Sequence, residues 1–273
     1  MSEMSCPGSG HLMLISPERL FYAGLLGRPR RRAVGGFGIY TAIAGELRVT
    51  IEGLPTQTGV IAIVPPYHAH TIQSDHLTIT NLVIEPETIA PGAMASLAAA
   101  DQHMQHKLAV RIRAAYSELL ATRRRDGFTT AEFDAIFFGE PLPRRDLDPR
   151  IARAIACISE FSGNAVTAAD CAALANLSQS RFLHLFKDET GIAFRAFRAW
   201  KRARHMLHFV NEDINLAHLA QDIGYPDSTH FSHSIRRFYG LKPRAIFSGS
   251  RDLAIYRGGQ SVAERGAMRQ GRA

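Results

Sequence analysis

The segment VTAADCAALANLSQSRFLHLFKDETG at residues 166–191 predicts two short helices joined by a sharp turn. Thr167 is placed to cap the first helix, with Asp170 three residues later as in a capping box. Asn176 stands at the turn, because Asn tolerates left-handed backbone well, and Ser178 caps the second helix. The apolar residues of that second helix fall at i, i+3 and i+4: Phe182, Leu185 and Phe186.

The same pattern returns in INLAHLAQDIGYPDSTHFSHSIRRFYGLKP at residues 214–243. Gly224 stands at its turn, and Asp227 caps its second helix, 49 residues after Ser178. The inward stripe of this helix consists of Phe231, Ile235 and Phe238. Two helix pairs with small polar outer faces suit the major groove of DNA, which admits one helix. The sequence therefore predicts two helix-turn-helix units.

The candidate DNA-binding residues lie on three helices. The outer face of the first unit consists of Gln179, Ser180, Arg181, Leu183, His184 and Lys187. The outer face of the second unit consists of Ser228, Thr229, His230, Ser232, His233 and Arg236. Between the units, GIAFRAFRAWKRARHMLHFV predicts a long helix in which Phe194, Phe197 and Trp200 pack inward. Its row of Arg195, Arg198 and Arg202 suits phosphate contacts, the alternative being a solvated surface row.

These segments resemble the DNA-binding module of the AraC family of bacterial transcription regulators, over about 100 residues. The most specific matches are SRFLHLFKDETG and IGYPDSTHFSHSIRRFYGLKP. The resemblance implies that both second helices enter successive major grooves. Two departures leave the base preference open: Asn176 stands where Gly is usual, and His233 replaces a frequent Arg.

The composition favours two domains and a polyanion partner. The chain has 273 residues, 46% of them hydrophobic, and a net charge of +7. Residues 1–146 are neutral, with 14 basic and 14 acidic side chains, so the excess lies in the C-terminal half. Three cysteines without metal or redox spacing, and no apolar run or leader-like start, predict a cytoplasmic protein.

The first half predicts an all-β domain. From His11 to Pro86, short strands alternate with Gly and Pro, and they are best closed into a small barrel or sandwich. The candidate strands are HLMLIS, GFGIYTAI, ELRVTIEG, GVIAIVP, HTIQ and LTITNLVIEP. A β barrel before such a module resembles the cupin-type ligand-binding half of many AraC-like regulators, and GVIAIVPPYHAHTIQS partly matches the second cupin motif.

The candidate ligand-binding residues of this barrel are Tyr22, Tyr40, His68 and His70. A metal is disfavoured, because the segment that corresponds to the first cupin motif has no His and one carboxylate, Glu46. Alternation would put His68 and His70 on one face of a strand, and His76 is the other clustered histidine. No cofactor and no catalytic residue set is predicted.

Residues 91–125 predict an amphipathic helix with Leu97, Met104, Leu108, Ile112 and Leu119 on one stripe, which either docks on the barrel or pairs with its copy in a dimer. The predicted divisions are a ligand-sensing and dimerising domain at 1–138, a linker at 139–149, a double helix-turn-helix domain at 150–250 and a disordered tail at 251–273.

The predicted fold class is therefore α+β with two domains: an N-terminal cupin-like β barrel with following helices, and an all-α double helix-turn-helix domain. The hypothesis is a sequence-specific DNA-binding transcription regulator that senses a small molecule and is not an enzyme. The expected partners are double-stranded promoter DNA, an effector, a second copy of the chain and, as a further candidate, RNA polymerase, with no membrane. The alternatives are a constitutive DNA-binding protein with a dimerising barrel and a metal-dependent cupin enzyme.

Overall fold

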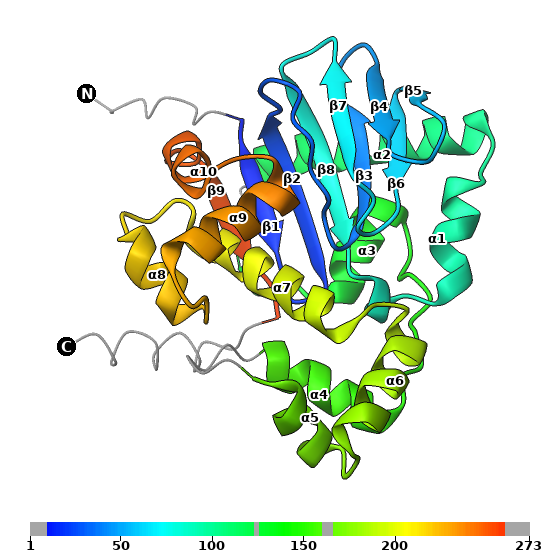
Figure 1. The fold of residues 1–273 in the computed structure, drawn as a ribbon. Helices are drawn as coiled ribbons and strands as arrows, with labels where there is room; N and C mark the ends of the chain where they lie inside the picture. Colours follow the sequence, from blue (N-terminus) through cyan, green and yellow to red (C-terminus); the bar gives the residue numbers. More distant parts are fainter. Residues whose placement is uncertain (1–9, 123–125, 160–165, 260–273) are drawn as a thin grey trace.

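The computed structural model describes residues 10–122, 126–159 and 166–259, which form a β-rich N-terminal part and a helical C-terminal part (Figure 1). The predicted α+β class and the order of the two parts are confirmed. Within these ranges, no helix is both long and apolar enough to cross a lipid bilayer.

The strands form two sheets. One has the order β6-β3-β8-β2-β1-β9 and the other β5-β4-β7, and every pair is antiparallel except β1 with β9. The strands are β1 (Leu12–Ile15), β2 (Arg19–Leu25), β3 (Phe37–Ala42), β4 (Leu47–Ile51), β5 (Gln57–Gly59), β6 (Ile61–Val64), β7 (His70–Ser74), β8 (Thr78–Ile84) and β9 (Ala254–Arg257). The sequence did not predict β2, because a strand that is buried on both faces lacks the alternation of apolar and polar residues.

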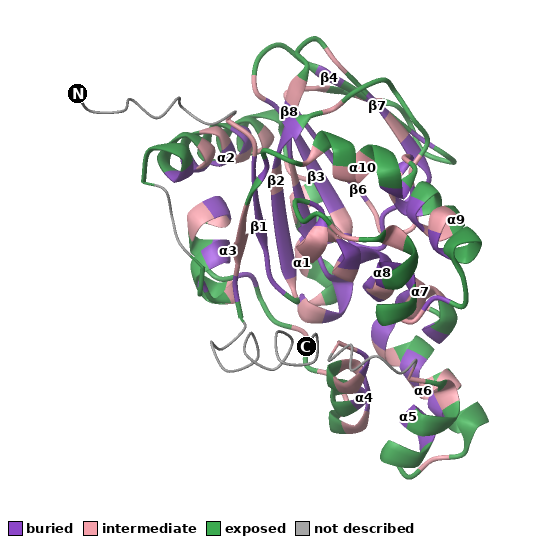
Figure 2. Ribbon diagram, turned by 90° about the vertical axis from the view of Figure 1, so that its left-hand side faces the viewer, coloured by how far each residue is buried: buried purple, intermediate pink, exposed green. Residues whose placement is uncertain are grey.

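The large sheet is covered on both faces (Figure 2). Leu14 and Phe21 of one face belong to a hydrophobic core shared with α2 (Gln102–Thr122) and α3 (Thr130–Phe138). Met13 and Ile15, on the opposite face of β1, belong to a second core that includes Trp200 and other residues of the C-terminal helices. The two parts of the chain therefore share a core.

The predicted helix over residues 91–125 is divided into α1 (Pro91–Ala98) and α2, preceded by the short turn η1 (Pro86–Thr88). The break has a local cause: the carboxylate of Asp101 accepts a hydrogen bond from the backbone N–H of Met104, 2.8 Å away, and so starts a new helix. Ile112 and Leu119 are buried in the core beneath the sheet, whereas Met104 is half exposed. Helix α2 thus docks on the N-terminal sheet.

The C-terminal part is built from short helices around α7. They are α4 (Pro149–Ser159), α5 (Ala168–Leu174), α6 (Gln179–Thr190), α7 (Phe194–His205) with its extension η2 (Met206–Phe209), α8 (Leu216–Asp222), α9 (Ser228–Tyr239) and α10 (Pro243–Gly249). The first helical unit has a core of its own around Phe182 and Phe186. The second unit, with Phe231 and Phe238, packs in the core that it shares with the N-terminal sheet.

The prediction of a disordered tail over residues 251–273 is wrong for its first part. Residues Ala254–Arg257 form β9, which pairs in parallel with β1 from Leu12↔Ala254 to Ile15↔Arg257. The pairing partner lies some 240 residues earlier in the chain, so no local periodicity could indicate it. Residues 260–273 lie outside the described ranges.

Candidate functional site

The first helix-turn-helix unit is fixed by local hydrogen bonds. Thr167 Oγ1 accepts from the backbone N–H of Asp170, and Asp170 Oδ2 accepts from that of Thr167 at 2.8 Å, which completes the capping box. The hydrogen bonds from Thr167 lower the pKa of Asp170. Asn176 adopts a left-handed backbone with φ of 53°, and Ser178 caps α6. These predictions are confirmed.

The second unit repeats this construction. Gly224 turns the chain with φ of 83°, and Asp227 Oδ1 accepts from the backbone N–H groups of Thr229 and His230, both at 2.8 Å. The other oxygen of Asp227 lies 2.8 Å from His230 Nδ1, so the cap also orients the first histidine of α9. The second helix of each unit therefore has a first turn that is capped by side-chain hydrogen bonds.

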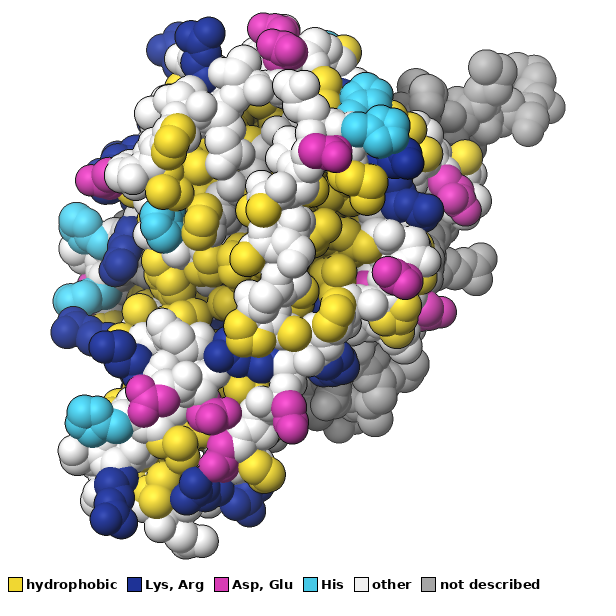
Figure 3. All heavy atoms as spheres, turned by 90° about the vertical axis from the view of Figure 1, so that its right-hand side faces the viewer, with side chains coloured by type: hydrophobic (Ala, Val, Ile, Leu, Met, Phe, Trp, Pro, Cys, Tyr) yellow, Lys and Arg dark blue, Asp and Glu magenta, His cyan; other side chains and the backbone are white. Residues whose placement is uncertain are grey.

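The outer faces of α6 and α9 lie largely free of the rest of the described chain. Leu183 and Ser232 are half-buried, and Leu183 packs against the core of the first unit. The other predicted residues of these two faces are exposed: Gln179, Ser180, Arg181, His184, Lys187, Ser228, Thr229, His230, His233 and Arg236. On the face of the molecule seen in Figure 3, Lys, Arg and His side chains gather along the left-hand margin, while apolar side chains occupy the middle.

The predicted basic row on α7 is unevenly placed. Arg195 is exposed, but Arg198 lies over the Phe194 ring at 5.6 Å and Arg202 over the Tyr225 ring at 6.0 Å. Both of these arginines are half-buried, so aromatic contacts fix their stems on the helix surface.

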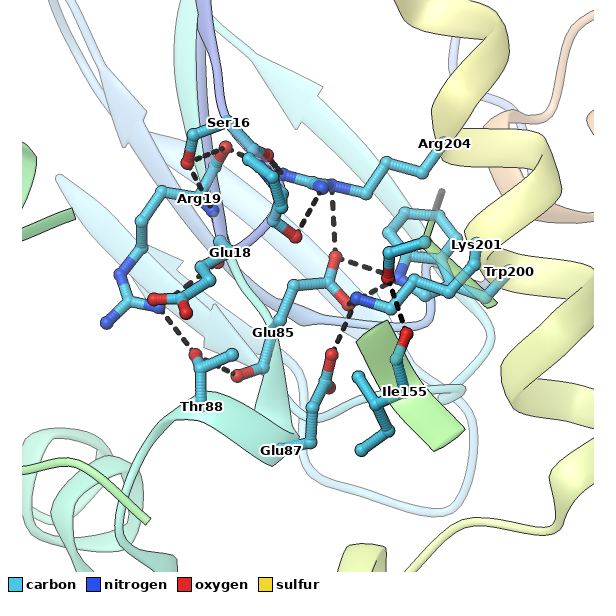
Figure 4. A network of polar contacts seen from close by, with 12 residues as sticks. Ser16, Glu18, Arg19, Glu85, Glu87, Thr88, Ile155, Trp200, Lys201 and Arg204 are labelled. Carbon is cyan, nitrogen blue, oxygen red and sulfur yellow. Dashed lines mark hydrogen bonds and ion pairs between the residues drawn. The ribbon is translucent and has the colours of Figure 1, made fainter. Parts of the chain in front are cut away.

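Two other cations of α7 face inward, and the sequence analysis did not predict this. Lys201 and Arg204 are buried against the end of β8 and the turn η1 (Figure 4). Lys201 Nζ lies 2.7 Å from Glu85 Oε2 and 2.6 Å from Glu87 Oε1. Lys and Arg side chains on a helix are mostly solvated, so the sequence of α7 does not mark this face as buried. Only its contacts with the carboxylates of the N-terminal part identify it as an interface.

Glu85 is the centre of this interface. Its carboxylate accepts from the indole N–H of Trp200 at 3.0 Å and pairs with Arg204 Nε at 3.0 Å, in addition to Lys201. Burial by itself would raise the pKa of Glu85, but the charges of Lys201 and Arg204 outweigh it and hold this pKa below its usual value. The guanidinium of Arg204 also donates to the backbone carbonyls of Ser16 and Arg19, each at 2.6 Å. Helix α7 is therefore bonded both to the N-terminal sheet and to the turn η1 that follows β8.

A cavity of about 260 Å³ lies between the N-terminal sheet and the C-terminal helices. Its walls are mainly apolar, with Leu20 and Val83 from the sheet and Leu207 and Ile246 from the helices. The cations that line it are Arg28, Arg30, Arg32 and Arg204. The first three come from the loop between β2 and β3. The second helix-turn-helix unit contacts this loop, because the N–H of Ala33 donates to the Arg237 carbonyl at 3.0 Å.

Buried polar atoms in the cavity wall lack hydrogen-bond partners. They are Arg32 Nε, Asn81 Oδ1 and Tyr239 Oη. A buried polar atom without a partner is costly, so such atoms mark a place where a ligand can supply hydrogen bonds. The cavity therefore combines an apolar body with a cationic, hydrogen-bonding rim.

Two of the four predicted ligand-binding residues line this cavity, Tyr22 and Tyr40. His70 lies behind Tyr40, and its Nε2 is 2.8 Å from the Tyr40 hydroxyl. Burial lowers the pKa of His70 to about 4, so the ring is neutral at pH 7. His68 is exposed in the turn before β7 and does not share a face with His70.

Within the described residues, no group of three or more His, Cys, Asp and Glu side chains is arranged to hold a metal ion. Tyr67, in the turn before β7, adopts φ of 61°, a left-handed backbone that glycine adopts more readily than other residues. Its hydroxyl is buried without a partner.

Residues 171–248 match the helix-turn-helix domain family. ToxT from Vibrio cholerae has a similar structure, with a TM-score of 0.55 and 13% identity over 85% of this chain and 98% of that chain. Wild-type ToxT with a bound unsaturated fatty acid gives a TM-score of 0.53 and 12% identity over 86% and 96%. A transcriptional regulator from Chromobacterium violaceum with an AraC-type DNA-binding domain is 17% identical over 38% of this chain and 92% of that chain, with a TM-score of 0.35.

No curated protein matches the chain. The likeness to ToxT extends over both parts of the chain and concerns the fold, whereas the family match is confined to the C-terminal part. Residues 171–248 of this protein therefore form a helix-turn-helix domain, and the chain as a whole has a fold similar to that of ToxT.

Proposed function

We propose that this protein is a transcription regulator that binds promoter DNA through both helix-turn-helix units and responds to an acidic, apolar effector. The observation that supports DNA binding is the pair of capped helices α6 and α9, each with an exposed polar and cationic outer face. A major groove admits one such helix, and the side chains on these faces can donate to and accept from base edges. The protein acts by binding and has no catalytic role.

Footprinting with purified protein on the DNA upstream of its own and adjacent genes tests this function. We expect a competitor-resistant site that covers adjacent major grooves on one face of the duplex. The variants His184→Ala and His233→Ala should each weaken specific binding by about 1–3 kcal/mol if their side chains contact bases. His106→Ala, an exposed histidine on α2, is the matched control. Loss of the complex to competitor at every sequence tried would overturn the proposal.

The proposed effector is a long-chain carboxylate. The mainly apolar walls suit a hydrocarbon chain, and the unpartnered Nε of Arg32 can donate a charge-assisted hydrogen bond to a carboxylate. An occupant would touch strands of the sheet and helices of the second unit together, so it can favour one arrangement of the two parts. One structure with this fold, that of ToxT, contains an unsaturated fatty acid.

Thermal unfolding with oleate and with oleyl alcohol separates the carboxylate from the chain. We expect oleate to stabilise the protein by about 2.7 kcal/mol at 100 times its dissociation constant. Oleyl alcohol should stabilise it less, because it cannot pair with the loop arginines. Arg32→Gln should remove the preference for oleate, and Arg31→Gln, which lies in the same loop outside the cavity lining, should keep it. The proposed role of Arg32 would be excluded if Arg32→Gln and Arg31→Gln kept the same preference for oleate over oleyl alcohol.

Homodimerisation through α2 stays a prediction. Met104 and Val110 are both about half exposed on the side of α2 that does not pack on the sheet. If this side pairs with its copy, Val110→Glu should convert a dimer into a monomer in sedimentation velocity. Lys107→Glu should weaken the dimer less than Val110→Glu does. Contact with RNA polymerase also stays a prediction.

A further inference from the structure

A loop of the N-terminal part carries four arginines and lies against the second helix-turn-helix unit. This loop joins β2 to β3, and its arginines are Arg28, Arg30, Arg31 and Arg32. The side chains of Arg28, Arg30 and Arg31 are exposed, whereas that of Arg32 is half-buried. Because the rest of the N-terminal part has as many acidic as basic side chains to offer a partner, this local excess of positive charge calls for an explanation of its own.

Backbone contacts fix the loop at the C-terminal end of α9. The N–H of Ala33 donates to the Arg237 carbonyl in the last turn of this helix at 3.0 Å. Gly240, which ends α9, leaves room for the loop, since a Cβ atom there would lie 2.9 Å from the Arg31 carbonyl oxygen. The C-terminal end of a helix is partly negative, so it also favours cations close by. The position of the loop beside α9 is therefore defined.

Exposed cations of both parts of the chain gather at this contact. Arg31 pairs with Glu52 at 2.6 Å, in a pair whose side chains are 70% and 68% exposed. Among the residues that the structure describes, Arg28, Arg30 and Arg236 have no acidic partner within ion-pair distance. The group, here called the junction cations, consists of Arg28, Arg30, Arg31, Arg236 and Arg237, all of them exposed.

The junction cations lie in line with the two helices proposed to enter DNA. In Figure 1, α6 lies at the bottom, α9 above it, and the upper end of β2, where the loop begins, higher still. Lys and Arg side chains also follow the left-hand margin of Figure 3 from its lower end to its upper end. Successive major grooves on one face of a duplex are one helical turn apart along its axis. A duplex that receives both helices therefore continues past the loop.

We propose that Arg28 and Arg30 bind phosphates of the DNA that flanks the groove read by α9. This rests on the proposed DNA-binding function of α6 and α9. Arginine donates charge-assisted hydrogen bonds to phosphate, and each neutralised phosphate releases counterions, so the contact adds affinity without reading sequence. The loop belongs to the N-terminal part and α9 to the C-terminal part. The flank contact therefore forms only while the two parts are docked as they are here.

Duplexes that carry the footprinted site test this contact with the full chain. One duplex keeps about one helical turn, roughly 10 bp, beyond each end of the site, and two others lack the flank at one end or the other. The variant carries Arg28→Gln with Arg30→Gln. The matched control carries Arg48→Gln with Arg111→Gln, at exposed positions of β4 and α2. Affinity is measured against salt without an effector, because Arg28 and Arg30 also line the interdomain cavity.

The expected result is a loss of salt dependence at one end of the site only. Removal of the flank at the α9 end should reduce the slope of log affinity against log salt by about 1.8 for the unmutated protein, about 0.9 for each phosphate. Removal of the other flank should change nothing. Arg28→Gln with Arg30→Gln should show the reduced slope on the full duplex and no further reduction when the α9 flank is removed. The control should behave as the unmutated protein does.

Three outcomes would contradict the proposal, and they are distinguishable. An unchanged slope for Arg28→Gln with Arg30→Gln on the full duplex would overturn the loop contact, while specific DNA binding stands. The same loss with and without the α9 flank would also overturn it, because the arginines would then act elsewhere. Absence of a competitor-resistant complex of the unmutated protein on every duplex would overturn the proposed DNA-binding function and this inference with it.

Discussion

Replacement of Glu85 by Gln should destabilise the protein more than any surface substitution, because it removes the negative charge between two buried cations. The carboxylate is fully buried, and it is in contact with Trp200, Lys201 and Arg204 at 2.7–3.0 Å. The amide keeps the shape but turns a donor group toward the cations. Removing one partner from a buried ion pair costs about 3–5 kcal/mol. This is a large share of the roughly 5–15 kcal/mol that stabilises a typical domain.

Urea unfolding followed by the fluorescence of Trp200, the single tryptophan of the chain, measures this loss at the interface itself. Glu52→Gln is the matched control, because it makes the same chemical change in an ion pair with Arg31 whose side chains are 70% and 68% exposed. The control should cost about 0–1 kcal/mol. The reasoning is refuted if Glu85→Gln lowers the free energy of unfolding no more than Glu52→Gln does.

Three other substitutions have defined outcomes. Thr167→Ala breaks the capping box of α5 and should cost about 1 kcal/mol in urea unfolding, and a cost near zero would show that the cap is not stabilising. The pKa of His70 is about 4 in the folded protein, below its value in the unfolded chain. As the pH falls, the unfolded chain therefore takes up the proton first, and the stability of the protein declines between about pH 6.5 and 4. His70→Gln should flatten this decline, measured as the free energy of unfolding against pH. Arg195→Gln should weaken binding to all DNA sequences and reduce the slope of log affinity against log salt by about 0.9, whereas Arg48→Gln, on an exposed strand position, should do neither.

The cavity and the buried ion-pair network share two residues. Trp200 and Arg204 line the cavity and also contact Glu85. A ligand that shifts either side chain therefore acts on α7, the helix that joins both helix-turn-helix units. It changes DNA binding only by the difference in its affinity for the two arrangements.

The sequence by itself determined the two helix-turn-helix units, down to the caps at Thr167, Ser178 and Asp227 and the left-handed turn at Asn176. These features depend on hydrogen bonds and backbone preferences within a few residues, so a local pattern suffices to predict them. The outer faces of α6 and α9 followed from the same helical period.

The tertiary structure alone decided which face of α7 is buried, where the tail pairs and which residues enclose the cavity. The inward turn of Lys201 depends on Glu85 and Glu87, more than 110 residues earlier, and β9 depends on β1 at the opposite end of the chain. Strand β2 is buried on both faces of the sheet, so its residues do not alternate between apolar and polar, and the sequence analysis did not predict it. Charge pairs and strand partners far apart in sequence leave no periodic signal, because the energy that places them comes from contacts formed only on folding.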